Sequence, residues 1–409
     1  MELLNVDSLN KTLEKLYNEF IKSGHSIATE EIPVSDALHR VLVDDIVSQI
    51  DVPEFNRPVV DGYAVKANDT QGASDSIPTF LNIVGESIMG ENCNISIESG
   101  ECVYVPTGAM IPKGANACVM IENTEMLTKD KITIYEAVAE GKNIVKKGDD
   151  INCGDIVLKS GRQLTFSDIG FLSSIGVYNV KVYKKWSITI ISTGDELIDE
   201  NNEYKFGKIR DINTNLLASC AKEHNFNVVK TYLLKDDSIA LENTIKESLK
   251  NSDVVIVSGG SSKGKKDMSS IIIDKITSSG ILTHGIAIKP GKPTITGFDK
   301  DSNTFVIGLP GHPVASAILF KFLVVGLYNI ITKCNKKKYT CKGIIQENMP
   351  ASPGRMTIQL VTVDDNYNVK PIYGRSGLIH TLSDADGYII IEKNQEGINK
   401  GDEVLVYYL

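Results

Sequence analysis

Residues 186–331 alternate short apolar runs with segments of helical periodicity, and this alternation restricts the fold more than any other feature of the chain. Three apolar runs are each followed by a helical pattern: 187–192 by 213–225, 228–234 by 238–250, and 253–258 by 267–279. Strands that alternate with helices form parallel sheets with helices on both faces. We therefore predict a doubly wound α/β domain over residues 181–332.

The segments that follow the apolar runs are rich in Gly, Ser, Thr and carboxylates. These segments are Ser192–Glu196, Lys235–Asp237, Ser258–Ser262 and Leu309–Pro313. In an open parallel sheet, ligands bind outside the carboxyl ends of the strands. The sequence therefore predicts one shared crevice that holds an anion near acidic side chains.

The loop that begins at Ser258 suits phosphate binding, because Gly259 and Gly260 are followed by two serines and several lysines. Its spacing imitates a P-loop, but Lys266 stands where the magnesium-binding Ser or Thr of a P-loop would be. This difference argues against an ATPase. A flexible glycine-rich loop with solvated lysines is the alternative interpretation.

Two further segments have the residue types of an anion or metal site. In 289–293, two prolines fix φ around Lys289 and Lys292, which lowers the entropic cost of presenting both cations to one anion. A plain surface turn is the alternative. In Thr193–Glu196, backbone N–H groups can bind an oxyanion and the carboxylates can bind Mg²⁺, although an ordinary helix cap has the same residues.

The remaining segments have other patterns. Residues 7–24 have helical spacing with Ser8 or Asp7 as the cap, 39–48 read as a strand, and 161–176 as a helix. Short strands between turns over 50–148 predict a β-rich insert, and those over 339–409 predict a small β barrel or sandwich. The longest apolar stretch, 314–331, contains Lys321 and Asn329, and we interpret it as a buried helix rather than a membrane span.

Composition excludes several classes of function. The formal charge of −9 disfavours general binding to nucleic acid or to acidic membranes. The seven cysteines are scattered without a C-x-x-C pair, which is typical of small buried residues in a reducing compartment. The first residues lack the basic region and the long apolar core of a signal peptide, so we expect a cytoplasmic protein.

Taken in order, several short motifs resemble the molybdopterin molybdenumtransferase family, which includes MoeA of bacteria and archaea and the E domain of gephyrin. The motifs are Pro53–Phe55, Asp61–Val65, Thr107–Ala109, Gly148–Ile151, Ser192–Leu197, Gly207–Asn213, Ser258–Gly260 with Asp267, Lys289–Pro293, and Leu309–Gly311 with Pro313. Each motif alone is weak, but their order and spacing across the chain are highly specific.

The resemblance implies a multidomain α/β plus β protein. Its parts would be an N-terminal helix (1–26) packing on the α/β domain, a linking domain (27–49 and 149–180), a β-rich insert (50–148), an α/β molybdopterin-binding domain (181–332) and a C-terminal β barrel (338–409). It also implies an elongated homodimer whose active site lies between the α/β domain of one subunit and the β-rich region of the other.

The implied reaction inserts molybdate into adenylylated molybdopterin and releases AMP, with Mg²⁺ as the cofactor. The resemblance implies that Asp61, Glu196, Asp237 and Asp267 are catalytic, with Asp236 as an alternative to Asp237, and that Asp61, Glu196 and Asp267 bind the metal. The implied substrate-binding residues are Thr107, Asp150, Ser258, Gly259, Gly260, Lys289, Lys292, Pro310, Gly311, Arg355 and Ser376.

The chain departs from the usual family pattern at a few positions. Val60 replaces a common Met, Pro58 replaces a Ser, and His312 replaces the usual Asn of Leu-Pro-Gly-Asn-Pro; Ser261 and Lys263 replace two valines. The resemblance adds the molybdopterin adenylyltransferase and molybdoenzyme chaperones as partners. The alternatives are an adenylyltransferase-type activity, a tungstate-inserting paralogue and a non-enzymatic, gephyrin-like scaffold.

Overall fold

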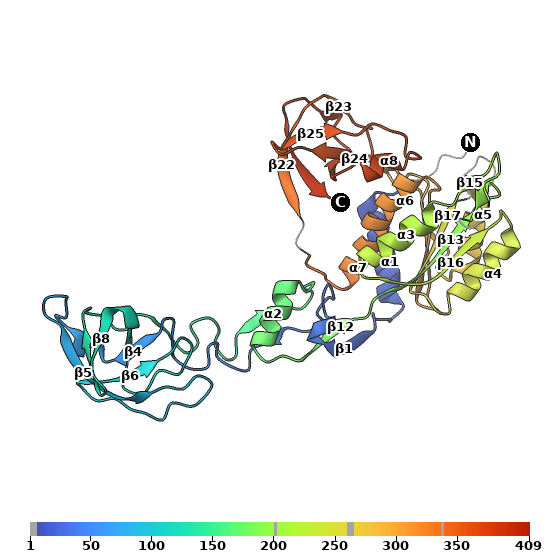
Figure 1. Ribbon diagram of the computed structural model, residues 1–409. Helices are drawn as coiled ribbons and strands as arrows, with labels where there is room; N and C mark the ends of the chain where they lie inside the picture. Colours follow the sequence, from blue (N-terminus) through green and yellow to red (C-terminus); the bar gives the residue numbers. More distant parts are fainter. Residues whose placement is uncertain (1–5, 200–202, 260–265, 337–338) are drawn as a thin grey trace. The chain divides into compact units, whose positions relative to one another are not determined.

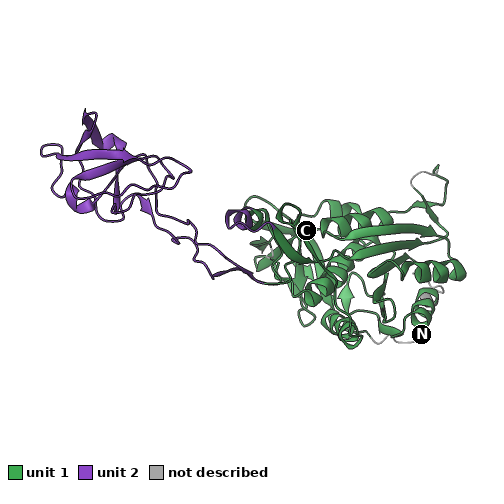
Figure 2. Ribbon diagram, turned by 90° about the horizontal axis from the view of Figure 1, so that it is seen from below, with its two compact units in different colours: residues 1–44, 160–169, 179–409 green, residues 45–159, 170–178 purple. Residues whose placement is uncertain are grey.

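The structure, a computed structural model, describes residues 6–199, 203–259, 266–336 and 339–409, apart from the side chains of Lys266 and Asp267. The chain forms two compact units (Figure 2). The first consists of residues 1–44, 160–169 and 179–409, and the second of 45–159 and 170–178. The first unit contains the α/β sheet and the C-terminal β strands, whereas the second is built mainly of β strands.

The α/β sheet of the first unit has six strands within the described residues (Figure 1). Their order is β16 (Asn227–Leu234), β13 (Ser187–Thr193), β17 (Val254–Gly259), β21 (Thr304–Leu309), β20 (Ile295–Asp299) and β18 (Ile281–His284). The first four are parallel, whereas β20 and β18 pair antiparallel. The predicted α/β fold is confirmed, with two antiparallel strands added at one edge.

Helices cover both faces of this sheet. On one face, α3 (Asn213–Glu223) packs with Val254 and Ile256 of β17 in one apolar cluster. On the other face, α4 (Ser238–Ser248) and α5 (Lys266–Ile276) pack with Val255 and Val257 in a second cluster. Successive side chains of a strand point to opposite faces, so a strand buried on both sides must be apolar throughout. This requirement explains the unbroken apolar run of β17.

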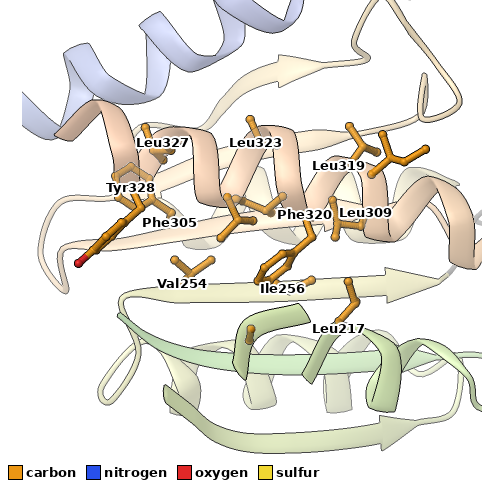
Figure 3. Packing of buried hydrophobic residues seen from close by; sticks show 14 of the residues in the cluster. Leu217, Val254, Ile256, Phe305, Leu309, Leu319, Phe320, Leu323, Leu327 and Tyr328 are labelled. Atoms are coloured by element: carbon orange, nitrogen blue, oxygen red, sulfur yellow. The ribbon is translucent and has the colours of Figure 1, made fainter. Parts of the chain in front are cut away.

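The long apolar segment near residue 320 forms part of the core. It consists of α6 (Pro313–Leu319), a π-helical turn η4 (Phe320–Val325) and α7 (Gly326–Ile331). Residues 313–331 are long and apolar enough to cross a membrane by composition, but they pack against the sheet as expected for a buried helix. Figure 3 shows the Phe320 side chain between this helix and the strand that carries Val254 and Ile256.

Helix α1 (Leu9–Lys22) belongs to the same apolar cluster. Its cap is Ser8, whose hydroxyl accepts a hydrogen bond of 3.3 Å from the Lys11 amide. Leu16 is fully buried, and the ring of Phe20 lies 6.3 Å from that of Phe298. The N-terminal helix therefore contributes directly to the core of the α/β sheet.

Replacement of Leu16 by alanine should lower the free energy of unfolding by about 2–5 kcal/mol, because it leaves a cavity in a closed core. Ile21→Ala, at a position of the same helix that is 52% exposed, should change it by less than about 0.5 kcal/mol. Urea unfolding followed by the fluorescence of the single tryptophan, Trp186, measures both, since Trp186 lies in the same cluster as Leu16. Equal effects of the two variants would contradict this packing.

The C-terminal strands close into a small barrel. Around it run β24 (Met356–Val363), β25 (Asn368–Pro371), β22 (Thr340–Ile345), β28 (Glu403–Tyr408) and β26 (Gly387–Ile391), and β26 pairs again with β24. Val361, Ile389 and Val406 belong to its apolar interior. The short pair β23 (Met349–Pro350) and β27 (Gly397–Ile398) and helix α8 (His380–Ser383) complete this region. The predicted barrel is confirmed.

The second unit contains another sheet with six strands among the described residues. Their order is β7 (Ala117–Met120), β4 (Gly62–Val65), β6 (Glu101–Val105), β5 (Thr79–Glu86), β9 (Lys131–Ile134) and β8 (Thr124–Thr128). The segments that precede and follow this sheet in the sequence form two short antiparallel pairs: β3 (Arg57–Pro58) with β10 (Ile144–Val145), and β2 (Ile46–Val47) with β11 (Ile156–Leu158).

The first unit contains a further antiparallel pair, in which β1 (Thr29–Pro33) pairs with β12 (Asn179–Tyr183).

Two sequence-based element predictions need correction. Residues 39–48 do not form one strand: Val41 pairs with Gln163 and Leu42 with Val182, so neighbouring residues pair with different segments, and only β2 is regular. The helix predicted over 161–176 is shorter, because α2 spans only Phe166–Ser174. The residues before it are extended, and Asp168 accepts a hydrogen bond of 2.9 Å from the Thr165 amide at the start of the helix.

Candidate functional site

The ends of β13 and β17 approach each other very closely at the carboxyl edge of the α/β sheet. Gly259 has φ +117°, and a Cβ atom there would lie 2.1 Å from the backbone oxygen of Thr193. A side chain at this position would force the two strand ends to move apart, and this φ is one that residues with a side chain rarely adopt. The glycine that the Ser258–Gly260 motif provides is therefore required by the backbone, independently of any ligand.

Asn213 joins two of the predicted loops at this edge. Its side-chain amide donates to the Ser258 hydroxyl at 2.8 Å and to the Gly311 backbone oxygen at 2.9 Å. Asn213 is the first residue of α3 and is only 8% exposed, so the helix start is fixed to both loops. Sequence reasoning placed Asn213 in a motif but missed this bridging role; its position at the predicted start of a helix was the available signal.

The carboxylates at the same edge have different surroundings. Both carboxylate oxygens of Glu196 lie 3.0 Å from the position that a Cβ of Gly194 would occupy, so this side chain folds over a glycine. Asp237 caps α4: one of its oxygens accepts hydrogen bonds from the amides of Ile239 at 2.8 Å and Ala240 at 3.1 Å. The structure thus gives Asp237 a capping role, and its catalytic role stays a prediction.

Beyond Glu196, the chain continues through two short strands, β14 (Leu197–Ile198) and β15 (Ile209–Arg210), which pair in parallel. The neighbouring carboxylate, Asp195, accepts a hydrogen bond of 3.2 Å from the Asp236 amide. The two loops that follow β13 and β16 are therefore held together at the sheet edge.

A large pocket lies where the α/β domain meets the barrel. Its volume is about 680 Å³. The two domains are joined here by hydrogen bonds, because β19 (Ile288–Lys289) pairs in parallel with β24, with Lys289 opposite Thr357. This pairing brings the Lys289–Pro293 segment next to Arg355, which precedes β24 and also lines the pocket. The sequence contains no signal for such a contact between distant segments.

The pocket is strongly basic. Among the described residues that line it, the charged side chains are Lys289, Lys292, Arg355 and Arg375, and no Asp or Glu belongs to the lining. The loop that carries the two lysines is held by its own backbone: the Lys292 oxygen accepts from the amides of Ile286 and Thr294, each at 2.9 Å. Sequence reasoning missed Arg375, although it directly precedes the predicted Ser376.

The far wall of the pocket comes from the loop between β21 and α6. Pro310 and His312 of this loop line the pocket together with Ser376. The Nδ1 atom of His312 lies 2.7 Å from the Ser376 hydroxyl oxygen, and the Val314 amide donates to the Ser376 backbone oxygen at 3.2 Å. These bonds connect the start of α6 to the loop before α8.

In the second unit, Asp61 and Thr107 form a direct pair. Both the amide and the hydroxyl of Thr107 donate to one carboxylate oxygen of Asp61, at 2.7 and 2.8 Å. These hydrogen bonds, first that of the amide, lower the pKa of Asp61 below its ordinary value, so the carboxylate is ionised. Asp150 is exposed on the same unit, and its amide donates to the Val52 oxygen at 3.0 Å.

The predicted site residues thus fall into three groups. The pocket unites Lys289, Lys292, Pro310, Arg355 and Ser376, the edge of the α/β sheet carries Glu196, Asp237, Ser258, Gly259 and Gly311, and the second unit carries Asp61, Thr107 and Asp150. Gly260 and the side chain of Asp267 lie outside the described residues, although the backbone of Asp267 belongs to α5.

Three carboxylates were predicted to hold Mg²⁺, which prefers oxygen ligands. In the described part of the chain, no group of three His, Cys, Asp or Glu side chains is close enough to bind a metal ion. The predicted set combines Asp61 of the second unit, Glu196 of the first and the undescribed Asp267 side chain. Oxygen donors of this kind suit Mg²⁺, and the ligand set stays a prediction.

Comparison with known proteins gives consistent matches along the whole chain. Residues 7–176 match the MoeA N-terminal region (domains I and II), 189–329 match a probable molybdopterin binding domain, and 342–409 match the MoeA C-terminal region (domain IV). A Methanocaldococcus jannaschii protein named for molybdopterin biosynthesis is 34% identical over 100% of this chain and 98% of its own length.

Two further relatives agree with these matches. The molybdopterin molybdenumtransferase of Haemophilus influenzae is 30% identical, over 92% of this chain and 93% of its own. The crystal structure of a molybdopterin biosynthesis MoeA protein from Pyrococcus horikoshii OT3 superposes with a TM-score of 0.85 at 29% identity, covering 99% of this chain and 100% of that one. With its α/β sheet, its barrel and the match over its full length, the chain belongs to the MoeA family of molybdenum cofactor biosynthesis enzymes.

Proposed function

We propose that this chain is a molybdopterin molybdenumtransferase that inserts molybdenum from molybdate into adenylylated molybdopterin and releases AMP. The observation that carries the proposal is the pocket between the α/β domain and the barrel, lined by four cationic side chains and, within the described lining, by no carboxylate. Molybdate and the phosphates of the pterin substrate are anions, so a concave surface with this charge concentrates them.

The side chains of the pocket suit a tetrahedral oxyanion. Arg355 and Arg375 present planar guanidinium groups that can donate two parallel hydrogen bonds, whereas Lys289 and Lys292 act as point charges. The Ser376 hydroxyl adds a neutral donor. The loop that carries Lys289 and Lys292 is already held by backbone hydrogen bonds, so the binding of an anion costs little conformational entropy.

The second group of residues supplies carboxylates. Asp61 is fixed in its ionised form by Thr107, and Glu196 lies at the edge of the α/β sheet. Together with Asp267 they would hold the Mg²⁺ that, when bound, neutralises phosphate charge and polarises the adenylyl phosphate. We also propose that the protein is a cytoplasmic homodimer. By its resemblance to the family, Asp61 and Thr107 of one subunit would then reach the substrate that is bound to the other subunit.

The test of this function is an incubation of the purified protein with adenylylated molybdopterin, molybdate and Mg²⁺. AMP release together with the appearance of molybdenum cofactor is the expected result. A folded dimer that releases no AMP and inserts no metal would refute the enzyme activity. A parallel incubation with tungstate shows which oxyanion the protein prefers.

Asp61→Ala and Asp267→Ala should each abolish AMP release without unfolding the protein, because both remove a carboxylate from the proposed metal site. Asp130→Ala is a matched control, since Asp130 is an exposed carboxylate in a turn of the same unit as Asp61. AMP release is measured at saturating Mg²⁺, and folding by circular dichroism. Full turnover of both variants would show that the carboxylates are wrongly assigned.

A further inference from the structure

A second cavity, of about 330 Å³, lies between helix α3, the long helix that begins with α6, and the C-terminal barrel. We call it the aromatic pocket, because Phe320, Phe322 and Tyr388 belong to its lining. Among the described residues that line it, only Ile318 also lines the basic pocket. Its volume is within the range of pockets that hold small molecules. It is therefore a separate candidate site and not an extension of the basic pocket.

Aromatic rings line this pocket from both domains. The rings of Phe322 and Tyr388 meet edge to face, with their centroids 5.4 Å apart. The ring of His224 stacks on that of Phe320, at 6.4 Å and 15°. Burial, together with the charges of nearby lysines, lowers the pKa of His224 to about 4, so this ring is uncharged near neutral pH. Because aromatic rings pack well in stacked and edge-to-face arrangements, these walls suit a flat aromatic ligand.

Two charged side chains, Lys321 and Glu223, belong to the described lining. Glu223 is exposed, so its charge is solvated, whereas Lys321 is half-buried. None of the ion pairs formed by the described residues involves Lys321. Burial lowers the pKa of Lys321, because its ammonium group has lost part of its water. An anion in the pocket would be attracted to this ammonium more strongly than to a lysine at the surface.

The ammonium group of Lys321 is placed by two contacts with described residues. Its Nζ atom donates to the Tyr408 backbone oxygen at 3.3 Å and lies 4.9 Å from the centre of the Tyr388 ring. A lysine ammonium has three N–H donors, so these contacts leave at least one N–H for a ligand. Lys321 also lies in the π-helical turn η4, and such turns are rare and frequently found at functional sites.

We propose that the aromatic pocket binds a small aromatic acid. The ring of the ligand would pack against Phe320, Phe322 and Tyr388, and its carboxylate would accept a hydrogen bond from Lys321. A neutral or basic ligand would leave the half-buried ammonium without an anion. The inference goes beyond the proposed function and does not depend on it, because it concerns another cavity and its test requires no AMP release.

Calorimetric titration of the full-length protein with cinnamate and with cinnamamide, at neutral pH, tests this inference. The two probes have the same ring and the same length, but only cinnamate carries a charge. The native protein should bind cinnamate at least about tenfold more tightly than cinnamamide, the difference that one charge-assisted hydrogen bond makes. Equal affinity for the two probes would overturn the inference.

Three variants assign the preference to this pocket. Lys321→Met keeps the apolar stem but removes the charge, so it should bind both probes with about equal affinity. Lys222→Met is the matched control and should keep the native preference, since Lys222 is an exposed lysine of α3 outside the described lining. Ser219→Trp should weaken the binding of both probes, because it fills the pocket from an exposed position of α3. Circular dichroism confirms that each variant is folded, and Ser219→Trp decides the question if Lys321→Met does not fold.

Binding in the basic pocket is distinguished by the Lys289→Ala, Lys292→Ala double variant. This variant should bind cinnamate as tightly as the native protein does. A loss of cinnamate binding here would place the acid in the basic pocket and overturn the inference. An unchanged preference in Lys321→Met would overturn it as well, and so would the absence of cinnamate binding by the native protein at about 1 mM.

Discussion

Replacement of Lys289 and Lys292 together by alanine should weaken molybdate binding by about a hundredfold or more, since each charged hydrogen bond contributes roughly 1.5–3 kcal/mol. Both side chains line the pocket from a loop whose backbone is fixed by its own hydrogen bonds. Among the described residues, neither lysine forms an ion pair with a carboxylate, so their removal leaves no buried charge without its partner. Stability should therefore change little.

Lys250→Ala is the matched control for this double variant. Lys250 is exposed near the end of α4 and does not line the pocket. The Lys250→Ala substitution removes a lysine ammonium group elsewhere on the α/β domain, so a general effect of net charge would appear in both variants. Titration with molybdate at two salt concentrations measures the effect. Native affinity in the double variant would exclude the pocket as the oxyanion site.

Gly259→Ala should lower the free energy of unfolding by more than about 3 kcal/mol, because the new Cβ meets backbone and the chain must separate β13 from β17. The Cβ would lie 2.1 Å from the Thr193 oxygen, and the residue has φ +117°. Since Gly259 is paired with Thr193 in the sheet, the distortion would occur at the edge that carries Glu196. Activity should be lost together with stability.

Gly24→Ala separates the two causes of this destabilisation. Gly24 has φ +75°, but nothing lies within 4 Å of a Cβ at that position. It should therefore cost only the conformational strain of a positive φ, about 1–2 kcal/mol. Urea unfolding followed by Trp186 fluorescence compares the two variants, because this tryptophan lies in the core of the same domain. Equal losses would mean that the close contact at Gly259 is tolerated.

The α/β domain could be predicted from the sequence because its elements are local. The run 253–258 is apolar throughout, and β17 is buried on both faces as such a run requires. The prediction of one strand over 39–48 was wrong because this segment depends on distant contacts: Val41 and Leu42 pair with different segments of the chain. Local composition cannot show which distant segment each residue will meet.

Most residues of the candidate site could be predicted from the sequence, but the contacts between them could not. The prolines beside Lys289 made this residue a candidate in the sequence. Its proximity to Arg355, however, results from the pairing of β19 with β24. The bond between Asp61 and Thr107 and the bridge made by Asn213 likewise join segments that are far apart in the chain. Arg375 was missed because a single arginine in a polar loop has no distinctive pattern.

Anomalous diffraction from a crystal of the native protein soaked in molybdate tests directly whether the basic pocket binds the oxyanion. We expect a molybdenum peak in the pocket, within about 4 Å of the charged atoms of Lys289, Lys292 and Arg355 and next to the Ser376 hydroxyl. The Lys289→Ala, Lys292→Ala double variant should lose this peak. Molybdenum bound elsewhere while this pocket stays empty would show that the pocket is not the oxyanion site.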